Sequence, residues 1–281
     1  MQRSDCLSKH LVLSLAALLS MKGTKTAMTH YFDSKLPHAG TTIFTVMSQM
    51  AADHGAINLS QGFPDFDGPE PLKAALRHYV DQGLNQYAPL AGVRELREQI
   101  ALKVEAIYGH TACPEKNITV VPGATEAIYC AIQATVRHGD EVIVFDPAYD
   151  SYQPSIELAG GKAVHVPLSA PDFQVDWQRV KDAVNANTRM IIINTPHNPT
   201  GTVWSAEEMR QLSALISDSS ILLLSDEVYE PVFYRYLRDH EMVVDIVGGF
   251  CFEKKNKIHI LPTYMYLLTL LVAPHAPIYF V

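Results

Sequence analysis

The sequence predicts an α/β fold, in which a mainly parallel sheet is covered by helices. From about residue 58 to residue 229, short runs of apolar residues alternate with segments whose apolar residues recur at a helical period. The runs are apolar at successive positions, which is typical of strands that are buried on both faces. Such strands, separated by helices, indicate a parallel sheet with helices on both sides. In these folds ligands collect beyond the carboxyl ends of the strands.

The expected elements can be placed along the chain from their periodicity. Helices are predicted at 69–82, 94–108 and 125–137, and a further helix is predicted to begin at Ser205. Gly109 is expected to end the second helix, and Ser205 with Glu208 three residues later predicts a capping box. Strands are predicted at 118–121, 141–145, 163–166, 190–193 and 221–224.

Composition and charge exclude several classes of protein. The chain has 281 residues, of which 48% are hydrophobic and 19% charged, enough for one large domain or for a large and a small one. Its net charge of −8 disfavours nucleic acid and anionic membranes as partners. The cysteines form no Cys-x-x-Cys pair and are widely scattered, at Cys6, Cys113, Cys130 and Cys251. We therefore expect no disulfide framework, no metal site and a cytoplasmic location.

The first 33 residues are predicted to form an extension that precedes the domain. Residues 11–19 are an apolar run that is too short to span a bilayer. The run is either the core of a signal peptide or the product of a start codon placed too far upstream, with Met21 or Met28 as the true beginning. We favour the misplaced start, because the rest of the sequence has a cytoplasmic composition.

Gly123-Ala124-Thr125 stands between a predicted strand and a predicted helix. Free backbone N–H groups and the positive end of a helix dipole suit an anion, and the Thr125 hydroxyl adds a donor. The alternative is an ordinary capped helix start. A nicotinamide site is excluded, because the chain has no Gly-x-Gly-x-x-Gly motif.

Polar residues also follow the later strands. Asp226 comes after a buried strand, where a carboxylate is costly unless it is paired; it could pair with a protonated pyridine nitrogen or cap the next helix. Asn198 lies in an Asn-Pro-x-Gly sequence that is also a common turn. Tyr149 could stack on an aromatic ring or be a core tyrosine, and Tyr87 is a weaker candidate.

Six motifs follow one another along the chain: Ser60-Gln61-Gly62-Phe63-Pro64-Asp65, Asn85-Gln86-Tyr87, Pro122-Gly123-Ala124-Thr125-Glu126, Asp146-Pro147-Ala148-Tyr149, Asn198-Pro199-Thr200-Gly201 and Ser225-Asp226-Glu227-Val228-Tyr229. In this order they resemble the signature series of fold-type I, class I/II pyridoxal-phosphate-dependent aminotransferases. The combination of Gly40-Thr41-Thr42-Ile43-Phe44 with Asn58-Leu59-Ser60-Gln61-Gly62-Phe63-Pro64-Asp65-Phe66 is most similar to bacterial methionine aminotransferases and their kynurenine aminotransferase relatives. The resemblance covers residues 34–230, which we expect to form part of the large domain.

The resemblance implies a role for each matching residue in binding pyridoxal 5'-phosphate. Gly123, Ala124 and Thr125 would hold the phosphate, and Tyr149 would stack on the ring. Asn198 and Tyr229 would hydrogen-bond the phenolic oxygen, and Asp226 would pair with the pyridinium nitrogen. Tyr87 would reach the phosphate in the other subunit of a homodimer. The substrates implied are an amino acid and a 2-oxo acid, which would face Gly62, Ile43 and Phe44.

The likeness ends after Glu230, and residues 231–281 read as an aberrant, non-homologous tail. In the family, a Ser-x-x-x-Lys-Thr stretch supplies the Schiff-base lysine. Here Lys254, Lys255 and Lys257 have no such context, and the small C-terminal domain also has no counterpart. The catalytic lysine is therefore taken to be absent. A sheet that stops at Glu230 would expose an unpaired strand edge and dissolve poorly.

Three functions remain open. The first is an aminotransferase homologue that acts on methionine or an aromatic amino acid and is inactive in this form. The second is a carbon–sulfur lyase of the same fold, although Asp226-Glu227-Val228-Tyr229, with tyrosine in place of histidine, favours the transferase. The third is a non-catalytic remnant.

Overall fold

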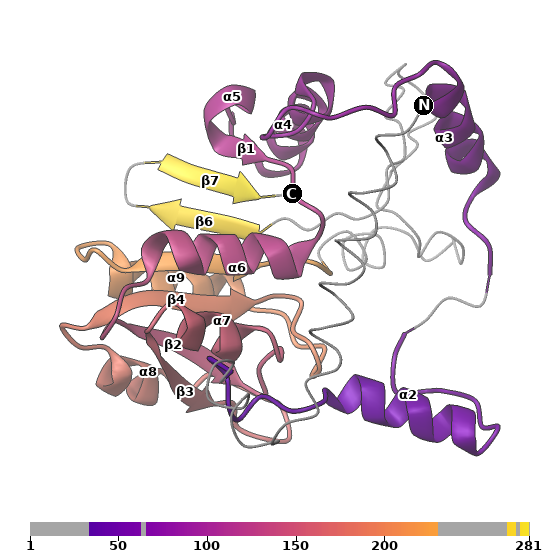
Figure 1. Cartoon of the computed structure of the whole chain (residues 1–281). Helices are drawn as coiled ribbons and strands as arrows, with labels where there is room; N and C mark the ends of the chain where they lie inside the picture. Colours follow the sequence, from indigo (N-terminus) through magenta and orange to yellow (C-terminus); the bar gives the residue numbers. More distant parts are fainter. Residues whose placement is uncertain (1–33, 63–65, 230–268, 274–275, 281) are drawn as a thin grey trace, which may run out of the picture. The chain divides into compact units, whose positions relative to one another are not determined.

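A seven-stranded sheet organises the chain in the computed structural model, which describes residues 34–62, 66–229, 269–273 and 276–280 (Figure 1). The strand order is β1-β7-β6-β5-β4-β2-β3. Four neighbouring pairs are parallel, and β6 is antiparallel to both of its neighbours. The prediction of a mainly parallel sheet is confirmed. The strands are β1 (Ile118–Thr119), β2 (Glu141–Asp146), β3 (Lys162–Pro167), β4 (Thr188–Asn194), β5 (Leu222–Asp226), β6 (Thr269–Ala273) and β7 (Ala276–Phe280).

The helices come where the periodicity predicts them, with additions. The helix predicted at 94–108 has the same bounds in the structure, and Gly109 ends it in a left-handed conformation with φ of 66°. Helix α2 and the short helices α5, α7 and α8 were not predicted; in the three short ones, one or two turns are too short to establish a period. The helices are α2 (Ile43–Asp53), α3 (Glu70–Asp81), α4 (Arg94–Tyr108), α5 (Pro114–Asn117), α6 (Ala124–Thr135), α7 (Tyr152–Leu158), α8 (Trp177–Ala183) and α9 (Ala206–Ile216).

Apolar side chains of β2, β4 and β5 alternate between two cores, one on each face of the sheet. Val142 and Val144 of β2 pack in one core with buried residues of α6 and α7. Ile143 and Phe145 pack in the other core, with Val180 of α8 and Leu212 of α9. This arrangement accounts for strands that are apolar at every position, because neither face of the sheet is left to water. A smaller core joins α4 to β1.

The tail of the chain enters this sheet. β6 pairs antiparallel with β5, with Thr269 opposite Asp226, and β7 pairs parallel with β1. The prediction of an unpaired edge after Asp226 is therefore wrong for β5, which lies between β4 and β6. The physical reason is that β6 supplies backbone hydrogen-bond partners to β5 and is itself paired with β7, although neither strand matches a predicted motif.

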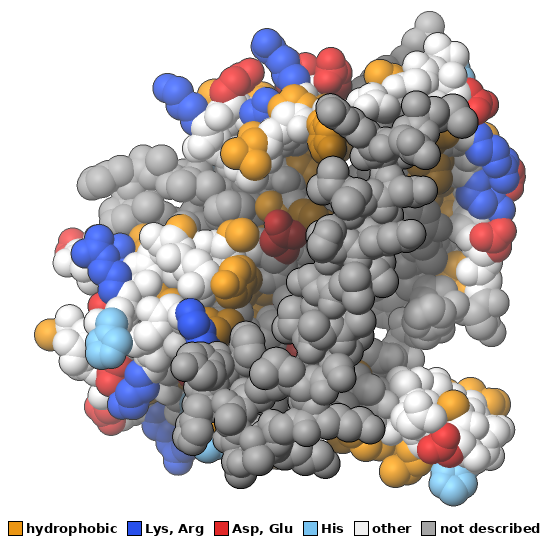
Figure 2. Space-filling model, viewed as in Figure 1, with side chains coloured by type: hydrophobic (Ala, Val, Ile, Leu, Met, Phe, Trp, Pro, Cys, Tyr) orange, Lys and Arg blue, Asp and Glu red, His pale blue; other side chains and the backbone are white. Residues whose placement is uncertain are grey.

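Helix α2 buries none of its residues. Ile43, Val46, Met47 and Met50 recur at a helical period and are exposed, and Figure 2 shows hydrophobic side chains on the surface of this helix. Among the described helices, none is long and apolar enough to cross a membrane. Of the four cysteines, the described Cys113 and Cys130 are free thiols, and Cys6 and Cys251 lie outside the described residues.

The predicted capping box is present at the start of α9. Ser205 Oγ accepts a hydrogen bond from the Glu208 N–H at 3.2 Å, and the Glu208 carboxylate accepts one from the Ser205 N–H at 2.7 Å. Replacing Ser205 by alanine should lower the free energy of unfolding by about 0.5–2 kcal/mol, because an N–H of the first turn loses its acceptor. Urea unfolding measures this change. Ser213→Ala, at an exposed position of the same helix, is the matched control and should change it by less than about 0.5 kcal/mol.

Candidate active site

The polar residues that follow β2, β4 and β5 meet at one edge of the sheet. The three strands are neighbours and run parallel, so their carboxyl ends lie on the same side. Tyr149 follows β2, Asn198 follows β4, and Asp226 is the last residue of β5. Thr125, in the first turn of α6, also reaches this group, because its Oγ1 lies 3.4 Å from the Tyr149 hydroxyl.

Asp226 is a buried carboxylate with two donors. It is only 3% exposed. Its Oδ2 accepts a hydrogen bond from the Tyr152 hydroxyl at 2.6 Å, and its Oδ1 accepts one from the Val228 N–H at 3.2 Å. The bond to Val228 is a local one, two residues along the chain, and no described helix begins there. Asp226 therefore does not cap a described helix, which was one of its two predicted roles.

Burial raises the pKa of the Asp226 carboxyl above its ordinary value, and the hydrogen bonds from Tyr152 and Val228 only partly oppose this shift. The ionised carboxylate is thus held at a free-energy cost that a nearby positive group would offset. Burial also raises the pKa of Tyr152, and the negative charge of Asp226 raises it further. The phenol therefore keeps its proton and acts as the donor in the pair.

Asn194 connects the strand end of Asp226 to the Asn198 turn. Its Nδ2 donates to the Asp226 carbonyl oxygen at 2.8 Å, and its Oδ1 accepts from the Asn198 N–H at 2.7 Å. The Thr195 N–H donates to the same carbonyl oxygen at 3.0 Å. No role was predicted for Asn194; its signal is that a polar, buried residue directly follows the apolar run Met190–Ile193.

Asn198 and Tyr229, which the resemblance assigns to the same oxygen of the cofactor, are brought together. Asn198 Nδ2 donates to the Tyr229 hydroxyl at 3.3 Å. The Tyr229 side chain is partly exposed, so both groups can reach a ligand. Burial raises the pKa of Tyr229, and the charge of Asp226 adds to the shift, against the hydrogen bond from Asn198.

The start of α6 has no side-chain cap. Gly123 is its N-cap residue, with φ of 103°, a backbone conformation that favours glycine, and no side chain bonds to the first turn there. The alternative of an ordinary capped helix start is thus not what the structure contains. The first-turn N–H groups of Ala124 and Thr125 have the orientation that suits an anion.

His197 stabilises the turn that carries Asn198 and was also missed. It is buried, and its Nδ1 lies 2.7 Å from Thr200 Oγ1. Burial lowers the pKa of His197, so the ring is neutral at pH 7. A neutral, buried ring is a structural support in this place, and nothing in a single sequence distinguishes it from an exposed turn histidine.

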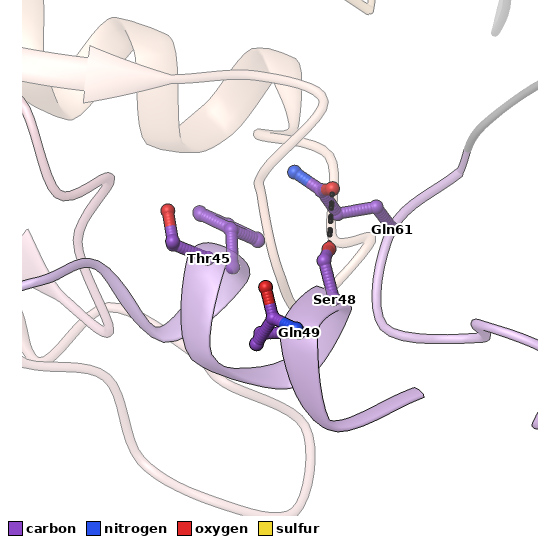
Figure 3. A pocket seen from close by; sticks show the side chains of 5 residues that line it. Thr45, Ser48, Gln49 and Gln61 are labelled. Carbon is purple, nitrogen blue, oxygen red and sulfur yellow. Dashed lines mark hydrogen bonds between the residues drawn. The ribbon is translucent and has the colours of Figure 1, made fainter. Parts of the chain in front are cut away.

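The remaining predicted residues lie before α4 in the chain and so follow no strand of the described sheet. Tyr87, Ile43 and Gly62 are exposed, and Phe44 is partly buried. Phe44 lines an open hollow of about 360 Å³ together with Thr45, Ser48, Gln49 and Gln61. Figure 3 shows the last four of these side chains around it. The Ser48 hydroxyl donates to Gln61 Oε1 at 3.3 Å across it. Ile43 and Gly62 do not line this hollow, and Phe63, Pro64 and Asp65 lie outside the described residues.

The sequence matches one family model, described as aminotransferase class I and II, over residues 54–263. This range reaches past Glu230, where the motifs end. The methionine aminotransferase of Escherichia coli is 55% identical over 199 residues, which are 71% of this chain and 52% of that protein. A probable N-succinyldiaminopimelate aminotransferase of Mycobacterium tuberculosis is 41% identical over 208 residues, 73% of this chain and 52% of that protein.

Solved structures give the same result. An Escherichia coli structure described as having a methionine aminotransferase function aligns with a TM-score of 0.69 at 55% identity, over 71% of this chain and 52% of that one. An aspartate aminotransferase of Thermus thermophilus aligns with a TM-score of 0.65 at 34% identity, over 71% and 54%. The predicted fold type is thus confirmed. The chain spans about half the length of the relatives it matches.

Replacing Asp226 by asparagine should raise the melting temperature of the ligand-free chain at neutral pH. The folded pKa lies above the ordinary value of 3.8, so the stability linked to this group is present below that value and is lost as the pH rises through the folded pKa. The difference in melting temperature between D226N and the wild type should therefore grow as the pH rises from about 4 and then level off. Thermal unfolding between about pH 4 and pH 8 tests this, with the exposed Asp172→Asn as the control. A lower melting temperature for D226N at pH 7 would contradict it.

Proposed function

Because this chain belongs to the class I and II aminotransferase family, we propose that it contains the pyridoxal-phosphate-binding part of an aminotransferase. The reaction proposed is transfer of an amino group from an amino acid to a 2-oxo acid. Methionine or an aromatic amino acid is the proposed donor, since the Escherichia coli relative is named a methionine aminotransferase. The observation that carries the proposal is the buried Asp226 carboxylate at the strand ends where Tyr149, Asn198 and Tyr229 also lie.

The residues present fit this cofactor in charge and in hydrogen-bonding capacity. The Asp226 carboxylate is buried and has no positive side chain among its described partners. A protonated ring nitrogen would supply the positive partner that the carboxylate lacks. An ionised carboxylate has about four acceptor positions, and two are in use. The uncapped first turn of α6 with the Thr125 hydroxyl would hold the phosphate. When bound, the cofactor supplies an electron sink for a carbanion at Cα.

Each remaining side chain would then orient or hold the ring. Tyr149 would contact its face, and the T-shaped packing of Tyr149 on Tyr152, with ring centroids 5.8 Å apart, supports this placement of the side chain. Asn198 and Tyr229 would donate to the ring's oxygen from one side. We also propose the homodimer of the family, in which the fully exposed Tyr87 would serve the partner subunit's site.

Asp226→Ala should weaken binding of pyridoxal 5'-phosphate more than Tyr149→Leu does. The first substitution removes a charge-assisted hydrogen bond, worth about 1.5–3 kcal/mol. The second removes an aromatic contact, worth about 0.5–1.5 kcal/mol beyond its buried area. Fluorescence titration of the wild type and both variants gives the three dissociation constants for pyridoxal 5'-phosphate, and hence their order. Equal affinities for the two variants would contradict the roles assigned to Asp226 and Tyr149.

The 281-residue chain should show no transamination of methionine above that given by free cofactor. We propose that no lysine of this chain serves as the covalent attachment point and proton carrier, a function worth about 10²–10⁴-fold as acid–base catalysis alone. Lys254, Lys255 and Lys257 lie outside the described residues. Borohydride reduction of the loaded chain, followed by peptide mass spectrometry, is the measurement. Stoichiometric labelling of one of these three lysines, together with turnover, would show the proposal to be wrong.

A further inference from the structure

Tyr152 reaches Asp226 from a distant part of the chain. It is the first residue of α7, 74 positions before Asp226, and both side chains are 3% exposed. Its ring belongs to the core that α6 and α7 form against the sheet, and its hydroxyl ends 2.6 Å from Asp226 Oδ2. No family motif named in the sequence analysis includes this residue.

The two donors on Asp226 act on different oxygens. Tyr152 bonds to Oδ2, and the Val228 N–H bonds to Oδ1. One donor on each oxygen fixes the rotation of the carboxylate about its Cβ–Cγ bond, and each oxygen keeps a free lone pair. The side-chain donor comes from a rigid, packed ring, so it holds the carboxylate with little loss of further conformational freedom.

We propose that Tyr152 is a positioning residue whose hydroxyl orients the Asp226 carboxylate toward the ring nitrogen of the cofactor. The proposal rests on the cofactor role proposed for Asp226. If the tyrosine hydroxyl only needed a hydrogen-bond acceptor in the core, removing it would change the free energy of unfolding and nothing else. A positioning tyrosine also affects how strongly the site distinguishes a ring with a nitrogen from a ring without one.

The test compares pyridoxal 5'-phosphate with its 1-deaza analogue, in which carbon replaces the ring nitrogen. Dissociation constants of both compounds are measured by fluorescence titration for the full 281-residue chain. The wild type should prefer the natural compound. Tyr152→Phe keeps the packed ring and removes the donor, and it should reduce the preference roughly threefold to tenfold.

Two further variants make the result specific. Tyr129→Phe removes a tyrosine hydroxyl from an exposed position of α6 and should leave the preference unchanged. In an Asp226→Asn background, adding Tyr152→Phe should produce no additional loss of preference, because the two residues act as one unit.

The possible failures can be told apart. If the wild type prefers the natural compound and Tyr152→Phe retains the full preference, the positioning role is wrong and the role of Asp226 stands. If the wild type binds both compounds equally, or binds neither, the proposed role of Asp226 fails and the inference fails with it.

Discussion

The buried carboxylate of Asp226 is the point on which the described site depends. It ends the strand β5, and its backbone oxygen accepts hydrogen bonds from Asn194 and Thr195. Its side chain is held by Tyr152 and Val228. Through Asn194 the same strand end also fixes the backbone of Asn198. One strand end thus connects α7, the turn after β4 and the segment that leads to Tyr229.

The sheet makes that arrangement rigid. β5 lies between β4 and β6, so its backbone is hydrogen-bonded on both sides up to Asp226 itself. Its side chains pack alternately into the two cores, with Leu224 on one face and Leu223 on the other. A carboxylate at the end of such a strand has little freedom to swing out to water, which is why its burial persists despite the cost.

Much of this framework could be predicted from the sequence, for reasons that are visible in particular residues. Strands buried on both faces appear as unbroken apolar runs, and α9 is marked by Ser205 and Glu208 at its start. Residues 276–280 were harder to predict: Pro277 lies within β7, and proline is a poor indicator of a strand. β7 is nonetheless paired on both sides, with β1 and β6.

The site could be predicted only in part. Asp226, Asn198, Tyr229, Tyr149 and Thr125 stand in recognisable local sequences, and the structure brings them to one edge of the sheet. Tyr152 and Asn194 have roles that depend on partners 74 and 32 residues away, which no local pattern encodes. The cofactor-binding roles of these residues stay predictions, as do the roles of Tyr87 and Gly62, which are exposed.

The raised pKa of Asp226 has a consequence for the folding equilibrium of the chain. A ligand whose cationic group neutralised this carboxylate would bind the folded form, where the site is assembled, and would thereby raise the folded population. For any such ligand, a concentration of about 100 times its Kd adds roughly 2.7 kcal/mol to the free energy of unfolding. That amount is a large fraction of the stability of an ordinary domain. Without such a ligand this contribution is missing, and the folded population depends on the other interactions of the chain alone.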